Sequence, residues 1–353
     1  MLDENIMDKL PTGSEVLSII DSSPNPRVGT VRIEVKLEDG SSRVYFGKGA
    51  SGDVGYNMMK GSFQAETALF NFIPEHVPRP ITYGTYQSQP DTHFYLCEFV
   101  EMLEDVPSAR EWAAAVATLH SRSMGCSPTG KFGFPMHTHL ANIPVDNTWN
   151  SSWEGLWTQQ MKSLLDQDEA LHGANEEFNR LKDSFFNIVI PRYLRPLESD
   201  GRSITPCLIH SDLWPGNIKP RLDSGRVCMF DSCAFWGHNE ADLGICRNPR
   251  YRLGSSYIQE YCQHIPVSEP KEDFEDRNAV YAMKYHVLLS VMYANNIKFR
   301  NIVIDEMRTL VERTILASRT AEPEAAHLYL EARAASSSTL GVNQYTRANQ
   351  LIL

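Results

Sequence analysis

The segment from Cys207 to Pro220, CLIHSDLWPGNIKP, leaves an apolar run and at once presents an acid and an amide five positions apart. Asp212 could accept the proton of a substrate hydroxyl, and Asn217 could offer a neutral amide oxygen to a magnesium ion. Fourteen residues beyond Asn217, VCMFD ends a predicted strand at Asp231, whose carboxylate could be a second ligand. Because magnesium keeps several positions for phosphate and water, two separate loops can hold it without a cage of protein ligands.

The pattern His210-x-Asp212-x-x-x-x-Asn217 has the spacing of the catalytic loop of kinases, and Asp231 stands where a kinase places its second metal ligand. Each residue alone has an ordinary structural explanation. An Asp after a strand is often part of a turn or a helix cap, and Pro-Gly-Asn is a common turn triplet. The combination favours the kinase interpretation over coincidence.

A kinase also needs a lysine on a strand of its small lobe, and Lys48 at the end of RVYFGK is the candidate to bind the nucleotide phosphates. The only glutamate in the predicted helix that follows is Glu66, the candidate to orient that lysine. In FYLCEFV, backbone groups from Glu98 to Val100 would meet the adenine, with Cys97 lining the pocket. A solvated lysine and a plain core strand are the alternatives, and no G-x-G-x-x-G motif precedes Lys48.

The elements that must position these residues divide the chain into a small β-rich part and a larger helical part. Residues 30–49 alternate on both sides of Asp39-Gly40, which predicts a β-hairpin. A helix is predicted over 56–74, and strands over 79–86 and 92–102. Amphipathic spacing predicts helices in four further segments: 108–123, 152–167, 175–198 and 255–318. Ser108 is expected to cap the first of them, and a long loop is expected over 125–148. We therefore expect an N-terminal lobe at 1–100, a C-terminal lobe at 101–335 and a tail at 336–353, with a ligand cleft between the lobes.

Composition excludes several classes of protein. The 353 residues carry a formal net charge of −11, which argues against a nucleic-acid or anionic-membrane surface. The seven cysteines are odd in number and form no C-x-x-C pair, which is typical of reduced thiols in an intracellular protein. From its acidic, mixed composition we expect the N-terminus not to be a signal peptide, and no apolar run is long enough to span a membrane. We expect a cytoplasmic protein.

The chain resembles the fructosamine kinase and ketosamine-3-kinase family, whose members are relatives of the aminoglycoside phosphotransferases. Matching stretches run from about residue 28 to 315 and include YFGKG, HVPRPITYGTY, SWEGLW, HSDLWPGN and FDSCAFWGHNEADLG. The resemblance implies an α+β, protein-kinase-like fold of two lobes. It also implies phosphorylation, by ATP with Mg²⁺, of the 3-hydroxyl of a ketosamine such as a fructosamine or ribulosamine on an amine or a protein lysine.

The resemblance also assigns roles to single residues. It implies Asp212 as the base, Asn217 and Asp231 as the magnesium ligands and Lys48 as the phosphate partner. Trp214 would lie beside the substrate, and a core tryptophan that supports the loop is the alternative. Three further residues would support the loop instead of taking part in the chemistry: His210, His238 and Asp242.

The chain departs from the family pattern at three places. Relatives carry H-G-D where Ser211 stands here, which adds a side chain at a tight approach. Relatives usually have a Glu directly after the position of Gly61, where this chain has Ser62, and Glu66 lies one helical turn further along. Finally, ANIPVDNTW lacks the Gln that often precedes this Trp in relatives, and that loop is expected to touch the acceptor.

Two other functions are compatible with parts of the sequence. A kinase-fold protein with altered or lost phosphotransfer could bind a nucleotide or another small molecule, or catalyse a different step; Ser62 and Ser211 motivate this alternative. A metal-dependent hydrolase could use His210, Asp212, Asp231 and His238, although no histidine pair is placed for zinc. The pair His137-x-His139 is expected to be a surface feature of the long loop.

Overall fold

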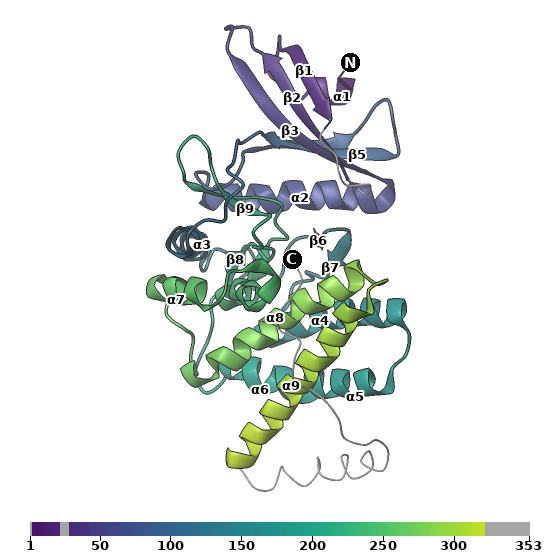
Figure 1. Ribbon diagram of the computed structural model, residues 1–353. Helices are drawn as coiled ribbons and strands as arrows, with labels where there is room; N and C mark the ends of the chain where they lie inside the picture. Colours follow the sequence, from purple (N-terminus) through teal and green to yellow (C-terminus); the bar gives the residue numbers. More distant parts are fainter. Residues whose placement is uncertain (1, 22–27, 322–353) are drawn as a thin grey trace.

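The computed structural model describes residues 2–21 and 28–321, so the predicted tail at 336–353 lies outside the described residues (Figure 1). The N-terminal lobe is one antiparallel five-stranded sheet with the order β1-β2-β3-β5-β4. A short helix, α1 (Glu4–Met7), precedes it. The strands are β1 (Glu15–Asp21), β2 (Gly29–Lys36), β3 (Ser42–Ser51), β4 (Pro80–Thr85) and β5 (Thr92–Glu98).

The predicted hairpin is confirmed as β2 and β3, which pair with Ile33 opposite Tyr45 and Thr30 opposite Lys48. The turn between them includes Gly40, whose φ of +81° is a conformation that residues with a Cβ rarely adopt. Alternate residues of the two strands, including Ile33 and Tyr45, are buried in a small core beneath the sheet. Lys48 is thus carried by a central strand, because β3 is hydrogen-bonded to β2 on one side and β5 on the other.

The predicted helix over 56–74 is confirmed as α2 (Gly52–Phe72), which begins somewhat earlier than predicted. Its apolar positions, such as Met59 and Leu69, are fully buried. In Figure 1, α2 runs across the sheet on the side that faces the helical lobe. Glu66 lies on this buried face and is only 2% exposed, so the helix carries one carboxylate toward the junction of the lobes.

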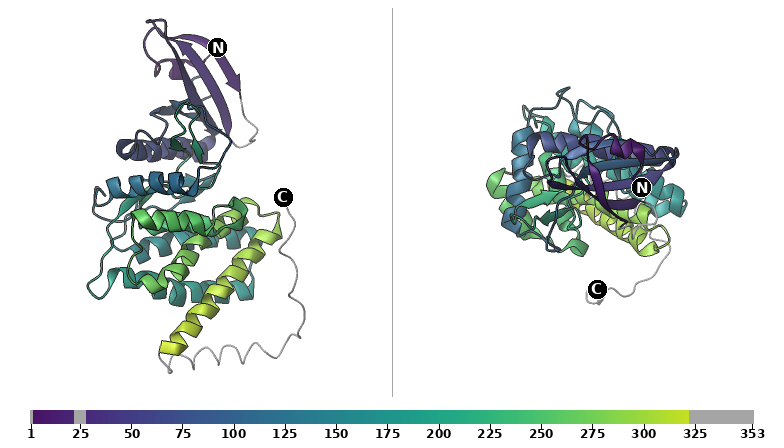
Figure 2. Two further views of the ribbon diagram at one scale, coloured as in Figure 1. Left: turned by 60° about the vertical axis from the view of Figure 1, so that its left-hand side comes forward. Right: turned by 90° about the horizontal axis from the view of Figure 1, so that it is seen from above.

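The C-terminal lobe is mostly helical, and in Figure 1 and the left view of Figure 2 it lies on the side of α2 opposite the sheet. Its first helix starts with a capping box, in which Ser108 and Glu111 bind each other's backbone N–H groups, as the predicted cap requires. α8 is buried on all sides and forms the centre of the lobe. The helices are α3 (Ala109–Ser123), α4 (Trp153–His172), α5 (Glu176–Ser184), α6 (Ile190–Leu194), α7 (Ser255–His264), α8 (Phe274–Met292) and α9 (Ile297–Ala321).

Three parts of the fold differ from the prediction. β1 and α1 were not predicted, and the long loop at 125–148 contains a small hairpin of β6 (Thr138–Leu140) and β7 (Ile143–Val145). The predicted helix over 175–198 is divided by a π-helical turn at Phe185–Val189 and ends in a 3-10 turn at Arg195–Glu198. Pro191 follows the π-helical turn and Pro196 lies within the 3-10 turn, and each lacks the N–H that an uninterrupted α-helix needs.

Two short ribbons place the loops of interest. β8 (Cys207–Ile209) pairs with β11 (Phe235–Gly237), and β9 (Ile218–Pro220) pairs with β10 (Val227–Met229). The loop after β8 and the loop after β10 therefore leave the two ribbons side by side. All seven cysteines lie in the described part of the chain and are free thiols. None of the helices within residues 2–21 and 28–321 is long and apolar enough to cross a membrane.

Candidate active site

The loops after β8 and β10 bring Asp212, Asn217 and Asp231 together. The Asn217 Nδ2 group donates to Asp212 Oδ2 at 2.8 Å and to the Asp231 carbonyl oxygen at 3.3 Å. Two backbone bonds fasten the loops, since the Phe230 N–H donates to Asn217 O at 3.0 Å and the Cys233 N–H to His210 O at 3.0 Å. The predicted base and both predicted metal ligands thus form one hydrogen-bonded group.

Asp242, on the 3-10 helix η3 (Asn239–Arg247), binds the backbone at the start of the loop after β8. Its carboxylate accepts the N–H groups of His210 at 2.8 Å and Ser211 at 2.6 Å, and it also contacts His120 Nε2 at 3.1 Å. Although burial raises the pKa of Asp242, these hydrogen bonds and the nearby histidines bring it below its ordinary value. The predicted bracing role of Asp242 is confirmed.

The bracing role predicted for His238 is wrong. Its ring nitrogens contact the Tyr281 hydroxyl at 2.8 Å and Ser268 Oγ at 2.9 Å, both away from the loop. His210 lies within the loop, and its Nδ1 accepts the Asp212 N–H at 3.3 Å, which is the orienting contact that the sequence suggested. Burial lowers the pKa of His210 to about 4, so this ring is neutral and able to accept at ordinary pH.

Two residues of the site have left-handed backbone conformations. Ser211 has φ = 66° and Asp231 has φ = 57°. For a residue other than glycine such a conformation costs on the order of 1–3 kcal/mol, and it persists where the surroundings fix it. Strained positions of this kind cluster at functional sites, and here they stand directly before Asp212 and at the second predicted metal ligand.

Lys48 reaches the site from the other lobe. Its ammonium forms an ion pair with the Asp231 carboxylate and lies 5.6 Å from the centre of the Tyr95 ring. The positive charge of Lys48 lowers the pKa of Asp231. Burial disfavours the charged lysine, but the attraction of Asp231 outweighs it and raises the pKa of Lys48. The structure therefore brings Lys48 to the predicted metal ligands across the junction of the lobes.

Glu66 has a different partner from the one considered in the sequence. Its Oε1 accepts the backbone N–H of Ser232 at 2.7 Å, while the lysine pairs with Asp231. Burial raises the pKa of Glu66 to about 7, against the opposing effects of Ser232 and the Lys48 charge. The contact ties α2 to the residue directly after Asp231.

This shifted pKa gives a test of the Glu66 environment by stability. Because the pKa of Glu66 rises from 4.5 to about 7 on folding, the folded state holds the proton more tightly. Wild-type stability should therefore fall as pH rises through this window, by up to about 3 kcal/mol. Glu66→Gln keeps an acceptor for Ser232 but does not ionise. The free energy of unfolding in urea of the variant, relative to that of wild type, should therefore be higher at about pH 8 than at about pH 4, by up to this amount. Parallel stability curves would contradict the assignment.

Asp212 is half-buried, and its carboxylate faces several charges. Burial and the neighbouring Asp231 charge raise the pKa of Asp212 to about 8, whereas Lys284 and the hydrogen bond from Asn217 oppose that rise. A carboxylate with a raised pKa is a stronger proton acceptor once ionised. The group is thus suited to accept a proton from an alcohol.

Trp214 is 39% exposed, so it is not the core tryptophan that was the alternative. Its ring folds over Gly216, where a Cβ would lie only 2.1 Å from a ring carbon, so a side chain at this position would displace the ring. The ring centre is 5.9 Å from that of Tyr251, at a tilt of 41°. Trp214 and Tyr251 form an aromatic wall beside the loop of Asp212.

The residues proposed for the adenine lie at the end of β5. Cys97 is buried among Met58, Met59 and Tyr95, as a pocket-lining residue of this lobe would be. The Glu98 N–H donates to the Arg79 carbonyl at 2.9 Å, so this donor is occupied within the lobe in this conformation. Val100 is buried directly after the strand. The part of these residues in nucleotide binding stays a prediction.

The donor set fits magnesium together with phosphate. The side-chain amide N–H groups of Asn217 donate to Asp212 and Asp231, which leaves the side-chain carbonyl oxygen as the atom that could bind a cation. The Asp231 side chain is 57% exposed and offers carboxylate oxygens. Within the described ranges no three His, Cys, Asp or Glu side chains gather as a metal site, so a cation here would need phosphate or water oxygens as further ligands.

Sequence reasoning missed two residues near the catalytic loop, Tyr251 and Lys284. Tyr251 stands in a short 3-10 turn, Pro249–Tyr251, without a motif. Lys284 lies in the middle of α8, where burial on every side removes the helical periodicity that would mark its face. Only the folded chain brings them to the loop.

Comparison with known proteins identifies the family. The model of the fructosamine kinase family matches residues 19–310. A chloroplastic protein-ribulosamine 3-kinase of Oryza sativa subsp. indica is 25% identical over 244 residues, 67% of this chain and 64% of that relative. The chain thus covers just under two thirds of that relative's length.

Two solved structures share the fold. A Thermobifida fusca protein described as a fructosamine-3-kinase has a TM-score of 0.66 at 18% identity, over 88% of this chain and 98% of that chain. A thermostable mutant of aminoglycoside phosphotransferase APH(4)-Ia, in a ternary complex with AMP-PNP and hygromycin B, has a TM-score of 0.57 at 12% identity, over 88% and 98% of the two chains. The predicted two-lobed, protein-kinase-like α+β fold is confirmed. Because the family model covers most of the chain, including both lobes and the two loops, this protein belongs to the fructosamine kinase family.

Proposed function

We propose that this protein transfers the γ-phosphoryl group of ATP to a hydroxyl of a ketosamine, with the 3-hydroxyl of a fructosamine or ribulosamine as acceptor. The observation that carries the proposal is the joined group of Asp212, Asn217 and Asp231, with Lys48 of the other lobe bound to it. The rice relative is a protein-ribulosamine 3-kinase, and the aminoglycoside phosphotransferase is in complex with AMP-PNP and hygromycin B. Both support an ATP-dependent transfer to a sugar-like alcohol.

The residues of the site divide the work of the reaction. Asp212 accepts the proton of the attacking hydroxyl, and Asn217 holds Asp212 in place. Lys48 binds phosphate oxygens, since its ammonium already lies among acceptor groups at the lobe junction. When bound by Asn217 and Asp231, Mg²⁺ would supply the positive charge that neutralises the phosphate oxygens. Catalysis then consists of positioning and charge stabilisation.

The acceptor would lie against the aromatic wall of Trp214 and Tyr251. Burial and the Asp212 charge raise the pKa of Tyr251 to about 12, which indicates that the phenol lies close enough to Asp212 to interact with its charge. Aromatic faces suit the apolar faces of a sugar, while the base takes the hydroxyl proton. A small or protein-bound ketosamine can approach here, because Trp214 stands at the surface.

The proposal is tested with γ-labelled ATP and lysine derivatives that carry fructose or ribulose as ketosamines. We expect label on the sugar, and we expect none on matched 3-deoxy ketosamines, which lack the acceptor oxygen but keep the rest of the adduct. Tight nucleotide binding with no transfer to any ketosamine would instead support the alternative of a kinase fold with altered chemistry. Equal labelling of the 3-deoxy compounds would refute the 3-hydroxyl as acceptor.

A further inference from the structure

Ser211 stands between His210 and Asp212 and is held by three separate contacts. Its N–H donates to Asp242 Oδ1 at 2.6 Å, and its carbonyl oxygen accepts the Tyr285 hydroxyl at 3.5 Å. Its Oγ accepts a hydrogen bond from Lys284 Nζ. Each polar atom of this left-handed residue is thus bound to η3 or to α8, elements far away in the sequence.

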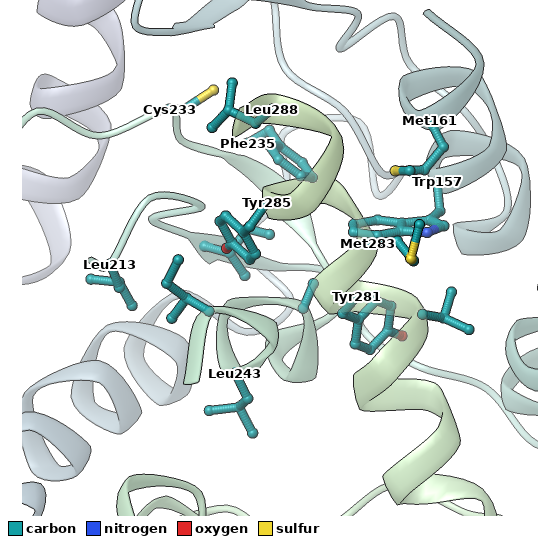
Figure 3. Packing of buried hydrophobic residues seen from close by; sticks show 14 of the residues in the cluster. Trp157, Met161, Leu213, Cys233, Phe235, Leu243, Tyr281, Met283, Tyr285 and Leu288 are labelled. Atoms are coloured by element: carbon teal, nitrogen blue, oxygen red, sulfur yellow. The ribbon is translucent and has the colours of Figure 1, made fainter. Parts of the chain in front are cut away.

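Lys284 is an unusual residue for the centre of a helical lobe. It is 3% exposed, and its ammonium lies 5.0 Å from the centre of the Phe235 ring. Its neighbour in the sequence, Tyr285, belongs with Phe235 and Leu213 to one buried apolar cluster (Figure 3). In the part of the chain that the structure describes, Ser211 Oγ is its one hydrogen-bond acceptor, and Lys284 forms no ion pair.

We propose that Lys284 is a positioning residue of the phosphotransfer site, which acts through Ser211 to fix the backbone that carries Asp212. The inference rests on the proposed function for its kinetic consequences. The hydroxyl of Ser211 gives Lys284 of α8 a hydrogen-bond acceptor on the loop, which a glycine at this position would lack. Lys284 and Tyr285, adjacent on α8, bind the side chain and the carbonyl of the same residue, so the turn before Asp212 is fixed from two directions.

The two residues of this bridge depend on each other. With Ser211→Gly, the backbone strain disappears but a buried ammonium loses its acceptor, which is more costly than the loss of an ordinary hydrogen bond. With Lys284→Met, the charge is gone but a left-handed serine remains with its hydroxyl unbound. When both changes are made, a glycine suited to this φ faces an apolar side chain, and neither defect remains. The effects of the two substitutions should therefore be far from additive.

A double-mutant cycle on the full chain tests the bridge. Because the Lys284 charge also lowers the pKa of Asp212, the rates are compared at an alkaline pH at which kcat of every variant has reached its plateau and the base is ionised in each. There each single variant is expected to lower kcat about 10-fold or more, with KM for ATP within about two-fold of wild type. The double variant should recover to within about three-fold of wild type. Lys182→Met is the matched control, since Lys182 pairs with Glu169 on the far helices α4 and α5 and should not couple to Ser211→Gly. Additive losses, or a change in KM alone, would overturn the proposal.

Wild type, the two single variants and the double variant also separate a failure of the bridge from a failure of the proposed function. If wild type transfers no phosphate to any ketosamine, the proposed function fails, but urea midpoints still measure the coupling between the two positions. Non-additive midpoints support the bridge, and additive midpoints overturn it. If Lys284→Met does not fold while the double variant does, the coupling is shown directly. If neither folds, Ser211→Ala and Lys284→Gln complete the cycle with smaller changes, and additivity there is equally decisive.

Discussion

Replacing Asp212 by Asn is expected to lower kcat for phosphotransfer by about 10³-fold, within the range that general base catalysis contributes. Asparagine has the same shape and keeps an oxygen that can accept the hydrogen bond from Asn217, so the loop should stay in place. It cannot accept the proton of the attacking alcohol. Because Asp212 does not hold phosphate in the proposed site, KM for ATP should change by less than about two-fold.

Labelled transfer to a ketosamine and nucleotide binding by calorimetry measure these two quantities. Asp223→Asn is the matched control, since Asp223 lies in the turn between β9 and β10 and, among the residues that the structure describes, its side chain bonds to its close neighbours Ser224 and Arg221. This control should be as active as wild type. An Asp212→Asn protein that retained most of its kcat would rule out the carboxylate as the base.

The predicted site residues that the structure brings together are those that share a loop or follow a strand. Asp212 and Asn217 are five positions apart, so local turn geometry fixes most of their separation. The hairpin of β2 and β3 was predicted because one face is buried and the other is not, which leaves an alternating pattern. Asp231 was predicted because an apolar strand ends there.

What the sequence did not predict depends on contacts between distant segments. β1 shows no clean alternation, since most of its residues are exposed, including Leu17 and Ile20, and no strand was predicted there. Glu66 was considered as a partner for a lysine, but its actual partner is a backbone N–H from a segment 166 residues away. The mistaken role of His238 has the same cause, because its partners come from α8 and a loop.

The ion pair of Lys48 and Asp231 joins the two lobes at the proposed site. The two residues are 183 positions apart, and they come from the central sheet strand and from the loop after β10. Glu66, which bonds the residue after Asp231, reaches the same loop from α2. Both contacts tie the small lobe to one side of Asp231, so the position of that carboxylate depends on both lobes.

Asp231→Asn is therefore expected to be as damaging as the loss of the base, with kcat/KM lowered by about 10³-fold, or about 4 kcal/mol of barrier. The variant keeps an oxygen but loses the negative charge that pairs with Lys48 and that a divalent cation would use. Burial is the larger cause of the raised pKa of Asp212, and the Asp231 charge adds to it, so removal of this charge should let the base ionise more readily than in wild type. A loss of activity relative to wild type could then not be explained by greater protonation of the base.

The dependence of the rate on magnesium concentration separates the role of Asp231 from that of Asp212. In Asp231→Asn the half-saturating Mg²⁺ concentration should rise by about 10-fold or more, whereas in Asp212→Asn it should stay near that of wild type. Asp223→Asn again serves as the control for the same change of charge a few residues away. An unchanged magnesium dependence in Asp231→Asn would mean that this carboxylate does not hold the cation, and its role would then be limited to its ion pair with Lys48.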